Sequence, residues 1–129
     1  MYRDPFVVAT DKVAAAGRAA CDAIEVAIRA LEVGARARTS GIPLVDIVDE
    51  LIGAGGRDVR LATADAFHEF ERALAEMRAH VVCTLVEEDG LSLTEVGLRL
   101  QISRQAVARL YRHANEGGGQ HDNKSDLRP

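Results

Sequence analysis

The chain has 129 residues, of which 47% are apolar and 28% charged, and its formal net charge is −4. This length fits one compact domain, or a small head with a dimerisation element, and this balance excludes an intrinsically disordered protein. The N-terminus, Met1–Lys12, carries Arg3, Asp4, Pro5 and Asp11 and has no apolar run long enough for a signal peptide, and no stretch of roughly 18 consecutive apolar residues occurs anywhere. We therefore expect no signal peptide, no membrane span and a cytoplasmic location.

Small and apolar residues recur at alternating steps of four and three after Thr10, which suits an N-cap. These residues, which we call the small-residue seam, are Val13, Gly17, Ala20, Ile24, Ala27, Leu31 and Gly34. The spacing predicts a helix that continues to about Arg38, longer than a small head needs for its own core. We therefore predict an N-terminal arm at 1–9 and a helical dimerisation region at 10–53, with the seam as the interface.

A second, shorter helix is predicted within the dimerisation region. The break before it falls at 39–43, because Gly41 suits a helix end and Pro43 suits a first helical turn. Apolar residues at 44–52 then have helical spacing. Glycines follow at once, and they predict a loop at 54–63.

The strongest apolar stripe of the chain predicts a third helix from about Asp65 to Glu87. Its members are Phe67, Phe70, Leu74, Met77, Val81 and Leu85. We expect this helix to supply the main wall of a head at 64–115. After Asn115, three successive glycines and very few apolar residues predict a disordered tail at 116–129.

Two helix starts lie close together in the last part of the head. Ser92 and Glu95 have the spacing of a capping box, and Ser103 is placed as a second N-cap. The two predicted helices are joined by a short turn just before Ser103. Gly97 falls where two helices joined in this way cross most closely, with no room for a large side chain. The apolar positions expected to face the core are Val96, Leu100, Ile102, Val107 and Leu110.

Positive charge is concentrated in this pair of helices. Residues 92–115 contain four arginines and one glutamate, a net charge of +3, so the remainder of the chain carries −7. A basic segment in an otherwise acidic protein is typical of a binding site for a polyanion.

The segment "GLSLTEVGLRLQISRQAVARLYRHA", which begins at Gly90, resembles the helix-turn-helix of bacterial transcription factors. It is most similar to the promoter-reading end of sigma factors and to the C-terminal heads of similar regulators. Together with the predicted helices, the resemblance indicates an all-α fold of about five helices, with a long N-terminal helix and a C-terminal helix-turn-helix. The family usually has glycine in the turn, where this chain has Gln101, and a left-handed backbone there would cost about 1 kcal/mol.

The resemblance implies that the second helix of the pair enters the major groove of DNA. The residues that would then contact DNA are Ser103, Arg104, Gln105, Ala108, Arg109 and Arg112, with Arg99 on the first helix. Glutamine can pair with adenine, arginine with guanine, and alanine can meet the thymine methyl group. Arg99 and Arg112 are placed by analogy for phosphates. We therefore expect a homodimeric transcriptional regulator whose partner is double-stranded DNA.

An alternative function is a protein-interaction adaptor that docks on RNA polymerase or another regulator without specific DNA contact. Helix-turn-helix shapes also serve as plain packing units, and exposed arginines can simply keep a helix soluble. The acidic remainder of the chain is compatible with the adaptor.

No enzyme activity and no cofactor are expected, because the glycine-rich "GAGGRDVR" follows no strand. No metal is expected either, since His80 and Cys83 share a helix without a second pair of ligands. We expect Cys21 and Cys83 to be small buried hydrophobes, although a redox switch or an interchain disulfide stays open.

Overall fold

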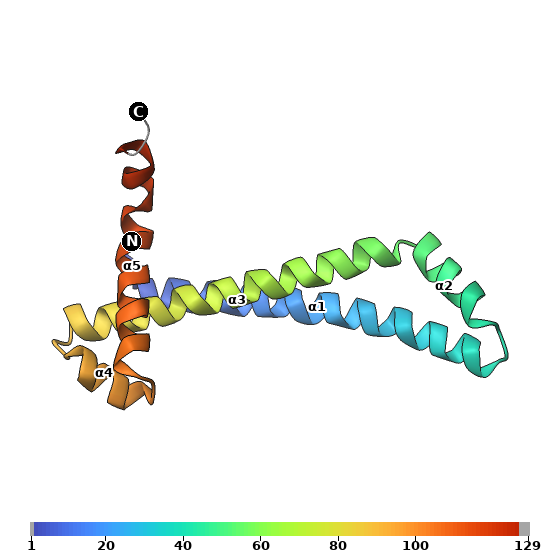
Figure 1. The fold of residues 1–129 in the computed structure, drawn as a ribbon, viewed down its shortest axis with the longest axis horizontal. Coiled ribbons are helices and arrows are strands. Elements are labelled where there is room, and N and C mark those ends of the chain that lie inside the picture. The colour runs from blue at the N-terminus through green and yellow to red at the C-terminus, as the bar shows by residue number, and fades with distance from the viewer. Residues whose placement is uncertain (1, 127–129) are drawn as a thin grey trace. The chain divides into compact units, whose positions relative to one another are not determined.

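The computed structural model describes residues 2–126, with side chains for 2–116, and the chain is helical without strands over that range. The helices are α1 (Pro5–Thr39), α2 (Leu44–Gly53), α3 (Gly56–Glu87), α4 (Leu93–Leu100) and α5 (Arg104–Asp126) (Figure 1). The predicted all-α fold with a long N-terminal helix is therefore confirmed. Within residues 2–126, none of these helices combines the length and the apolar character that crossing a lipid bilayer requires.

The chain divides into two compact units. One unit, Lys12–Ala73, is continuous in sequence, and we call it the continuous unit. The other, which we call the head unit, combines Met1–Asp11 with Leu74–Pro129 and contains α4 and α5. This division differs from the predicted head at 64–115, because the first residues of α1 belong to the head unit, where Ala9 is only 5% exposed.

α1 begins at Pro5 rather than after Thr10. The Asp4 carboxylate caps it, with Oδ1 accepting from the backbone N–H of Phe6 at 2.8 Å and of Val7 at 3.4 Å. A short acidic cap followed by proline at the first helical position is a favourable helix start, and it precedes the one that we predicted.

The break between α1 and α2 lies where the sequence predicted it. Gly41 has a φ of +92°, and its N–H donates to the carbonyl oxygen of Arg38 at 3.0 Å. The N–H of Ile42 donates to the carbonyl oxygen of Ala37 at 3.2 Å. This pair of hydrogen bonds is the Schellman motif, which satisfies the last carbonyl groups of α1.

α3 begins at Gly56 rather than near Asp65, so the predicted loop at 54–63 is wrong. Apolar and small side chains recur there at four-residue steps on one face, and they are Val59, Thr63 and Phe67. The preceding glycines hid this pattern in the sequence. A Cβ at Gly56 would lie 2.6 Å from the carbonyl oxygen of Leu51, so this glycine permits a close approach between α2 and α3.

The small-residue seam of α1 packs inside the continuous unit. A Cβ at Gly17 would lie 3.2 Å from the Phe70 ring on α3, and one at Gly34 would lie 3.2 Å from the Ile47 side chain on α2. Gly17 and Gly34 are therefore covered by the same chain and cannot contribute to the predicted dimer interface. Leu31 differs from them, because it is 67% exposed.

Three valines form the core of the head unit, namely Val82 of α3, Val96 of α4 and Val107 of α5, and all are fully buried. The half-buried side chains that pack around them are Leu85, Val86, Leu91, Leu93, Leu110 and Tyr111. Leu100 and Ile102, which we expected in this core, are each 38% exposed. Leu100 is the last residue of α4 and Ile102 lies in the turn after it, so both are at the edge of the core rather than within it.

Two further side-chain predictions are wrong in the continuous unit. Phe67 is 46% exposed and Cys21 is exposed, although both were expected to be buried. Both line a hollow beside the contact of Gly17 with Phe70, so they lie at the edge of the α1–α3 packing rather than within it.

α5 continues to Asp126, whereas we predicted disorder from 116; residues 127–129 of that predicted tail lie outside the described residues. A helix that has already formed its first turn gains one hydrogen bond for each residue added. No proline interrupts the chain between Ser103 and Asp126.

Candidate nucleic-acid interface

The predicted capping box starts α4. The N–H of Glu95 donates to Ser92 Oγ at 3.1 Å, and the N–H of Ser92 donates to Glu95 Oε1 at 3.4 Å. Leu91, just before the cap, packs against the core that contains Val96. The only acidic side chain of 92–115 is therefore engaged at the helix start, where a carboxylate is favourable.

The turn after α4 has the predicted left-handed residue. Gln101 has φ 60° and ψ 41°, and among the described residues it is the only non-glycine residue with a positive φ. Its N–H and that of Ile102 both donate to the carbonyl oxygen of Gly97, the latter at 3.0 Å. The turn is thus closed by backbone hydrogen bonds, although it lacks the glycine that is usual there.

Gly97 is buried at the closest approach of the turn to α4. A Cβ on this residue would lie 2.9 Å from the Ile102 carbonyl oxygen and 3.6 Å from Val107 Cγ2. The predicted reason for glycine at this position is confirmed, because backbone rather than a flexible side chain occupies the space.

Ser103 is the N-cap of α5, and its Oγ accepts from the backbone N–H of Ala106 at 3.0 Å. Its two faces then differ sharply over the first three turns. The face toward the core carries the buried Val107 and the half-buried Leu110, Tyr111 and Ala114. The outward face carries the residues expected to contact DNA, of which Arg104, Gln105, Arg109 and Arg112 are exposed and Ala108 is half-buried.

The structure brings six of the seven predicted contact residues together on α5 and its N-cap. Arg104, Ala108 and Arg112 follow one another at four-residue steps, and so do Gln105 and Arg109, so these five share one face of α5. Together with the N-cap Ser103 we call them the α5 stripe. Arg99 is exposed in the last turn of α4, on the other helix of the pair.

The arginines of this region are not engaged by other groups of the described chain. The ion pairs among the described residues join Arg3 with Asp11, Arg29 with Glu25, and Arg72 with Glu69. No ion pair or hydrogen bond within residues 2–116 involves the side chains of Arg99, Arg104, Arg109 or Arg112. Their charge is therefore available to a ligand.

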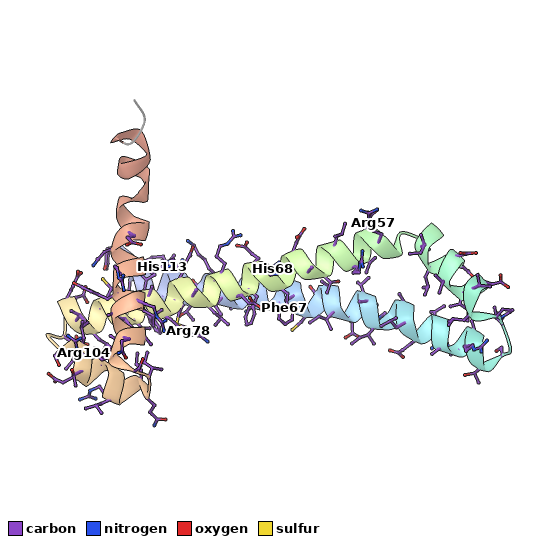
Figure 2. The ribbon with its side chains drawn as sticks, in the orientation of Figure 1. Arg57, Phe67, His68, Arg78, Arg104 and His113 are labelled. Atoms are coloured by element: carbon purple, nitrogen blue, oxygen red, sulfur yellow. The ribbon has the colours of Figure 1, made fainter. Side chains whose placement is uncertain are left out.

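Arg78 is a basic residue that our sequence reasoning missed. With Arg109 and His113 it lines a hollow of about 680 Å³ between α3 and α5, whose apolar floor includes Ile102 and Leu110. Figure 2 labels Arg78 on α3 and both Arg104 and His113 on α5. No motif includes Arg78, and only the packing of α5 against α3 places it beside the α5 stripe.

A hydrogen bond links α5 to the end of α3. The Tyr111 hydroxyl donates to Glu87 Oε1 at 3.0 Å, and the Cys83 thiol donates to Glu87 Oε2 at 3.3 Å. The hydrogen bond to Glu87 raises the pKa of Tyr111 above its usual value. Partial burial, followed by the hydrogen bond to Glu87, raises the pKa of the Cys83 thiol, which keeps it protonated. Only the Tyr111 hydrogen bond joins α5 to α3, whereas the Cys83 thiol bonds within α3 itself.

His80 and Cys83 do not join further ligands. His80 is exposed and Cys83 faces Glu87. Among the side chains that the structure describes, no group of three or more histidine, cysteine, aspartate or glutamate residues could hold a metal ion.

Comparison with known proteins gives no relative for this chain. No protein-family model, no curated protein and no solved structure matches it. The chemistry of the site must therefore be read from its own geometry, which combines a firmly packed helix pair with an exposed basic stripe.

Proposed function

We propose that the protein is a sequence-specific, double-stranded DNA-binding transcriptional regulator that acts as a homodimer. Its recognition element is the α5 stripe, placed in the major groove. The observation that carries the proposal is that four arginines and Gln105 stand exposed and unengaged on a helix pair packed around buried valines. Such a regulator would work in the cytoplasm, where bacterial DNA is found.

The residue types of the α5 stripe suit both kinds of DNA contact. Arg104 and Gln105 lie in the first turn of α5, where recognition helices meet base edges, and their side chains can form bidentate pairs with guanine and adenine. Arg112 lies two turns further on, and Arg99 lies on α4, so both are placed for phosphate contacts that give affinity without sequence preference.

A homodimer is supported by the apolar surface of the continuous unit. A single helix-turn-helix reads few base pairs, whereas a two-fold dimer reads two half-sites about one helical turn of DNA apart. The continuous unit exposes large apolar side chains, with exposures of 67% for Leu31, 64% for Val45 and 61% for Ile52. Clustered apolar side chains on a soluble surface mark an interaction site.

A second candidate function is an adaptor that docks on RNA polymerase or another regulator. One observation favours it: Leu98, on α4, is 76% exposed. An exposed apolar side chain next to the exposed Arg99 suits a protein partner as well as DNA.

The proposal is tested by fluorescence anisotropy of a labelled duplex pool with the full chain at two salt concentrations. We expect binding that weakens steeply with salt, because each phosphate contact releases condensed counterions. Arg112→Ala should reduce the slope of log K against log salt by about 1, whereas the matched variant Arg72→Ala, whose arginine pairs with Glu69, should not change it. A chain that binds no duplex at low salt but is captured by purified RNA polymerase would be the adaptor.

A further inference from the structure

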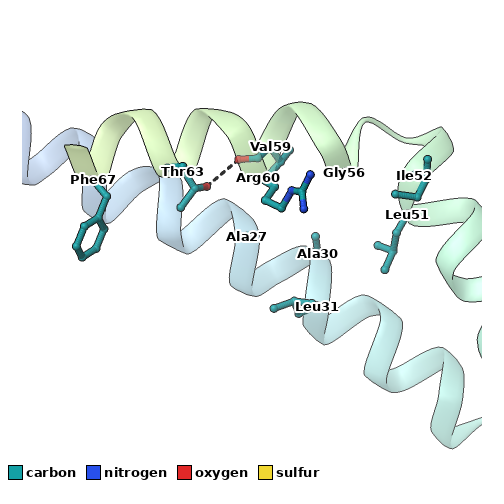
Figure 3. A pocket seen from close by; sticks show the side chains of 11 residues that line it. Ala27, Ala30, Leu31, Leu51, Ile52, Gly56, Val59, Arg60, Thr63 and Phe67 are labelled. Carbon is teal, nitrogen blue, oxygen red and sulfur yellow. Dashed lines mark hydrogen bonds between the residues drawn. The ribbon is translucent and has the colours of Figure 1, made fainter. Parts of the chain in front are cut away.

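An apolar groove of about 580 Å³ lies inside the continuous unit, between α1, α2 and α3. Its walls include Ala27 and Leu31 of α1, Ile52 of α2, and Val59 and Phe67 of α3 (Figure 3). Arg60 is the only charged residue of the lining, and Figure 3 shows its side chain reaching into the space between α3 and α1. No ion pair or hydrogen bond within the described residues engages Arg60.

The outer face of α2 has the complementary character. Ile47 points into the chain and is 6% exposed, whereas the opposite side of the helix is apolar and open. The exposed apolar residues turned away from Ile47 are Val45 at 64%, Val48 at 46% and Ile52 at 61%, and Leu44, in the first turn, is 59% exposed. Asp49 borders this stripe, and α2 carries three acidic residues and no basic one. An apolar stripe edged by a carboxylate matches an apolar groove that contains an unengaged arginine.

We infer that α2 of a second copy of this chain occupies the groove, and that each copy does this to the other. In this arrangement the exposed stripe of α2 covers the groove of the partner, and Asp49 lies near the partner's Arg60. The inference rests on the homodimer of the proposed function and assigns its interface.

The position of α2 favours a second copy over a small ligand. A two-fold interface must carry the projection and the recess on the same surface patch. α2 meets this requirement, because Ile52 belongs both to the wall of the groove and to the exposed stripe. A small apolar anion would satisfy Arg60 but would leave Leu44, Val45 and Val48 in water, whereas a second copy covers them as well.

The experiment is size-exclusion chromatography with light scattering on the full chain and on variants whose helical content is checked by circular dichroism. The wild type should be a dimer. Val48→Glu should raise the dimer dissociation constant more than about tenfold. The matched control is Leu61→Glu, since Leu61 is 48% exposed, close to the 46% of Val48, but does not line the groove, and this variant should remain dimeric.

Charge reversal tests the pairing itself. Arg60→Asp and Asp49→Arg should each raise the dimer dissociation constant. The dissociation constant of the double variant should be at least about tenfold lower than that of either single variant. Val48→Ala and Arg60→Gln, which add no charge, keep the test valid if a charged variant fails to fold, and both should weaken the dimer. A monomeric wild type, a dimer lost in Leu61→Glu but kept in Val48→Glu, or a double variant without recovery would overturn the interface.

The DNA-binding proposal can fail separately. A monomeric wild type that still binds duplex DNA would overturn only the interface. A wild-type dimer that behaves as expected in the variants but binds no DNA would overturn the proposed function and leave the interface standing.

Discussion

Gln101 and Gly97 fix the turn between α4 and α5 by different means. Gln101 has a left-handed backbone conformation, which is unfavourable for residues that carry a Cβ. Gly97 has no Cβ, and the Ile102 carbonyl group occupies the space where one would lie. The orientation of the α5 stripe depends on both residues, since they set how α5 leaves α4.

We expect Gln101→Gly to stabilise the head unit. The left-handed conformation costs a non-glycine residue roughly 1–2 kcal/mol, and the greater chain entropy of unfolded glycine offsets part of the gain. The free energy of unfolding in urea should therefore rise by about 0.5–1 kcal/mol. As a control, Leu98→Gly, within α4, should lower it by about 1 kcal/mol. A lower stability for Gln101→Gly would show that the side chain has a role in the turn.

We expect even Gly97→Ala to destabilise the protein. The added Cβ would lie 2.9 Å from a backbone oxygen, which cannot rotate away, so the cost should be about 1–3 kcal/mol by thermal or urea unfolding. The matched control is Gly53→Ala, because nothing lies within 4 Å of a Cβ at that helical position. Equal stabilities for the two variants would be inconsistent with the packing described for Gly97.

At the scale of elements, the head is organised by the attachment of α5 to α3. Val107 and Leu110 pack into the core, and Tyr111 adds a directed hydrogen bond to Glu87 at the end of α3. The contact restricts the rotation of α5 and leaves its outward face unoccupied, as the proposed base recognition would require.

Tyr111 should ionise at a higher pH than an ordinary tyrosine, whose pKa is about 10, because its protonated hydroxyl donates a hydrogen bond to Glu87. The chain has two tyrosines, so in a Tyr2→Phe variant the ultraviolet absorbance change of tyrosine ionisation comes from Tyr111 alone. This titration should place the pKa of Tyr111 above 10. Glu87→Gln should move it back toward the usual value. The contact stabilises the protein below about pH 10, and this contribution is lost as pH rises through the raised pKa. An unchanged titration in Glu87→Gln would contradict the contact.

The sequence was most informative where local chemistry decides the structure. The capping box at Ser92 and the N-cap at Ser103 depend on neighbouring residues, and both were predictable. The left-handed backbone of Gln101 was considered only because of the resemblance. The start of α3 was missed because glycines that serve close packing resemble a loop. The use of the seam was missed because a narrow, small-residue face suits packing within one chain as well as between two copies, and only the positions of Phe70 and Ile47 decide it.

At the scale of the whole molecule, segments far apart in the sequence belong to one compact unit. The head unit contains Met1–Asp11 as well as Leu74–Pro129, a long-range pairing that no local pattern could predict. Ala9 of the first segment is only 5% exposed, so the start of α1 is packed rather than surrounded by solvent.

Ala9→Arg should therefore destabilise the head unit. A long charged side chain cannot occupy a buried alanine position without displacing its neighbours, and we expect a loss of about 2 kcal/mol or more in the free energy of unfolding. Val7→Arg, two residues earlier at a position that is 45% exposed, should change it by less than about 0.5 kcal/mol. Thermal unfolding followed by circular dichroism checks both, and equal effects would show that the N-terminal segment does not pack as described.

The central claim, that the α5 stripe reads double-stranded DNA, is tested most directly by the affinity of Gln105→Ala for two duplexes. One duplex is obtained by selection with the wild-type chain, and the other is its scrambled version. The account predicts a loss of about 1–3 kcal/mol on the selected duplex and a much smaller loss on the scrambled one. Arg57→Ala, an exposed arginine of the continuous unit, should bind both as the wild type does. An equal loss on both duplexes would assign Gln105 to the DNA backbone, and a wild-type chain that selects no duplex would contradict the claim itself.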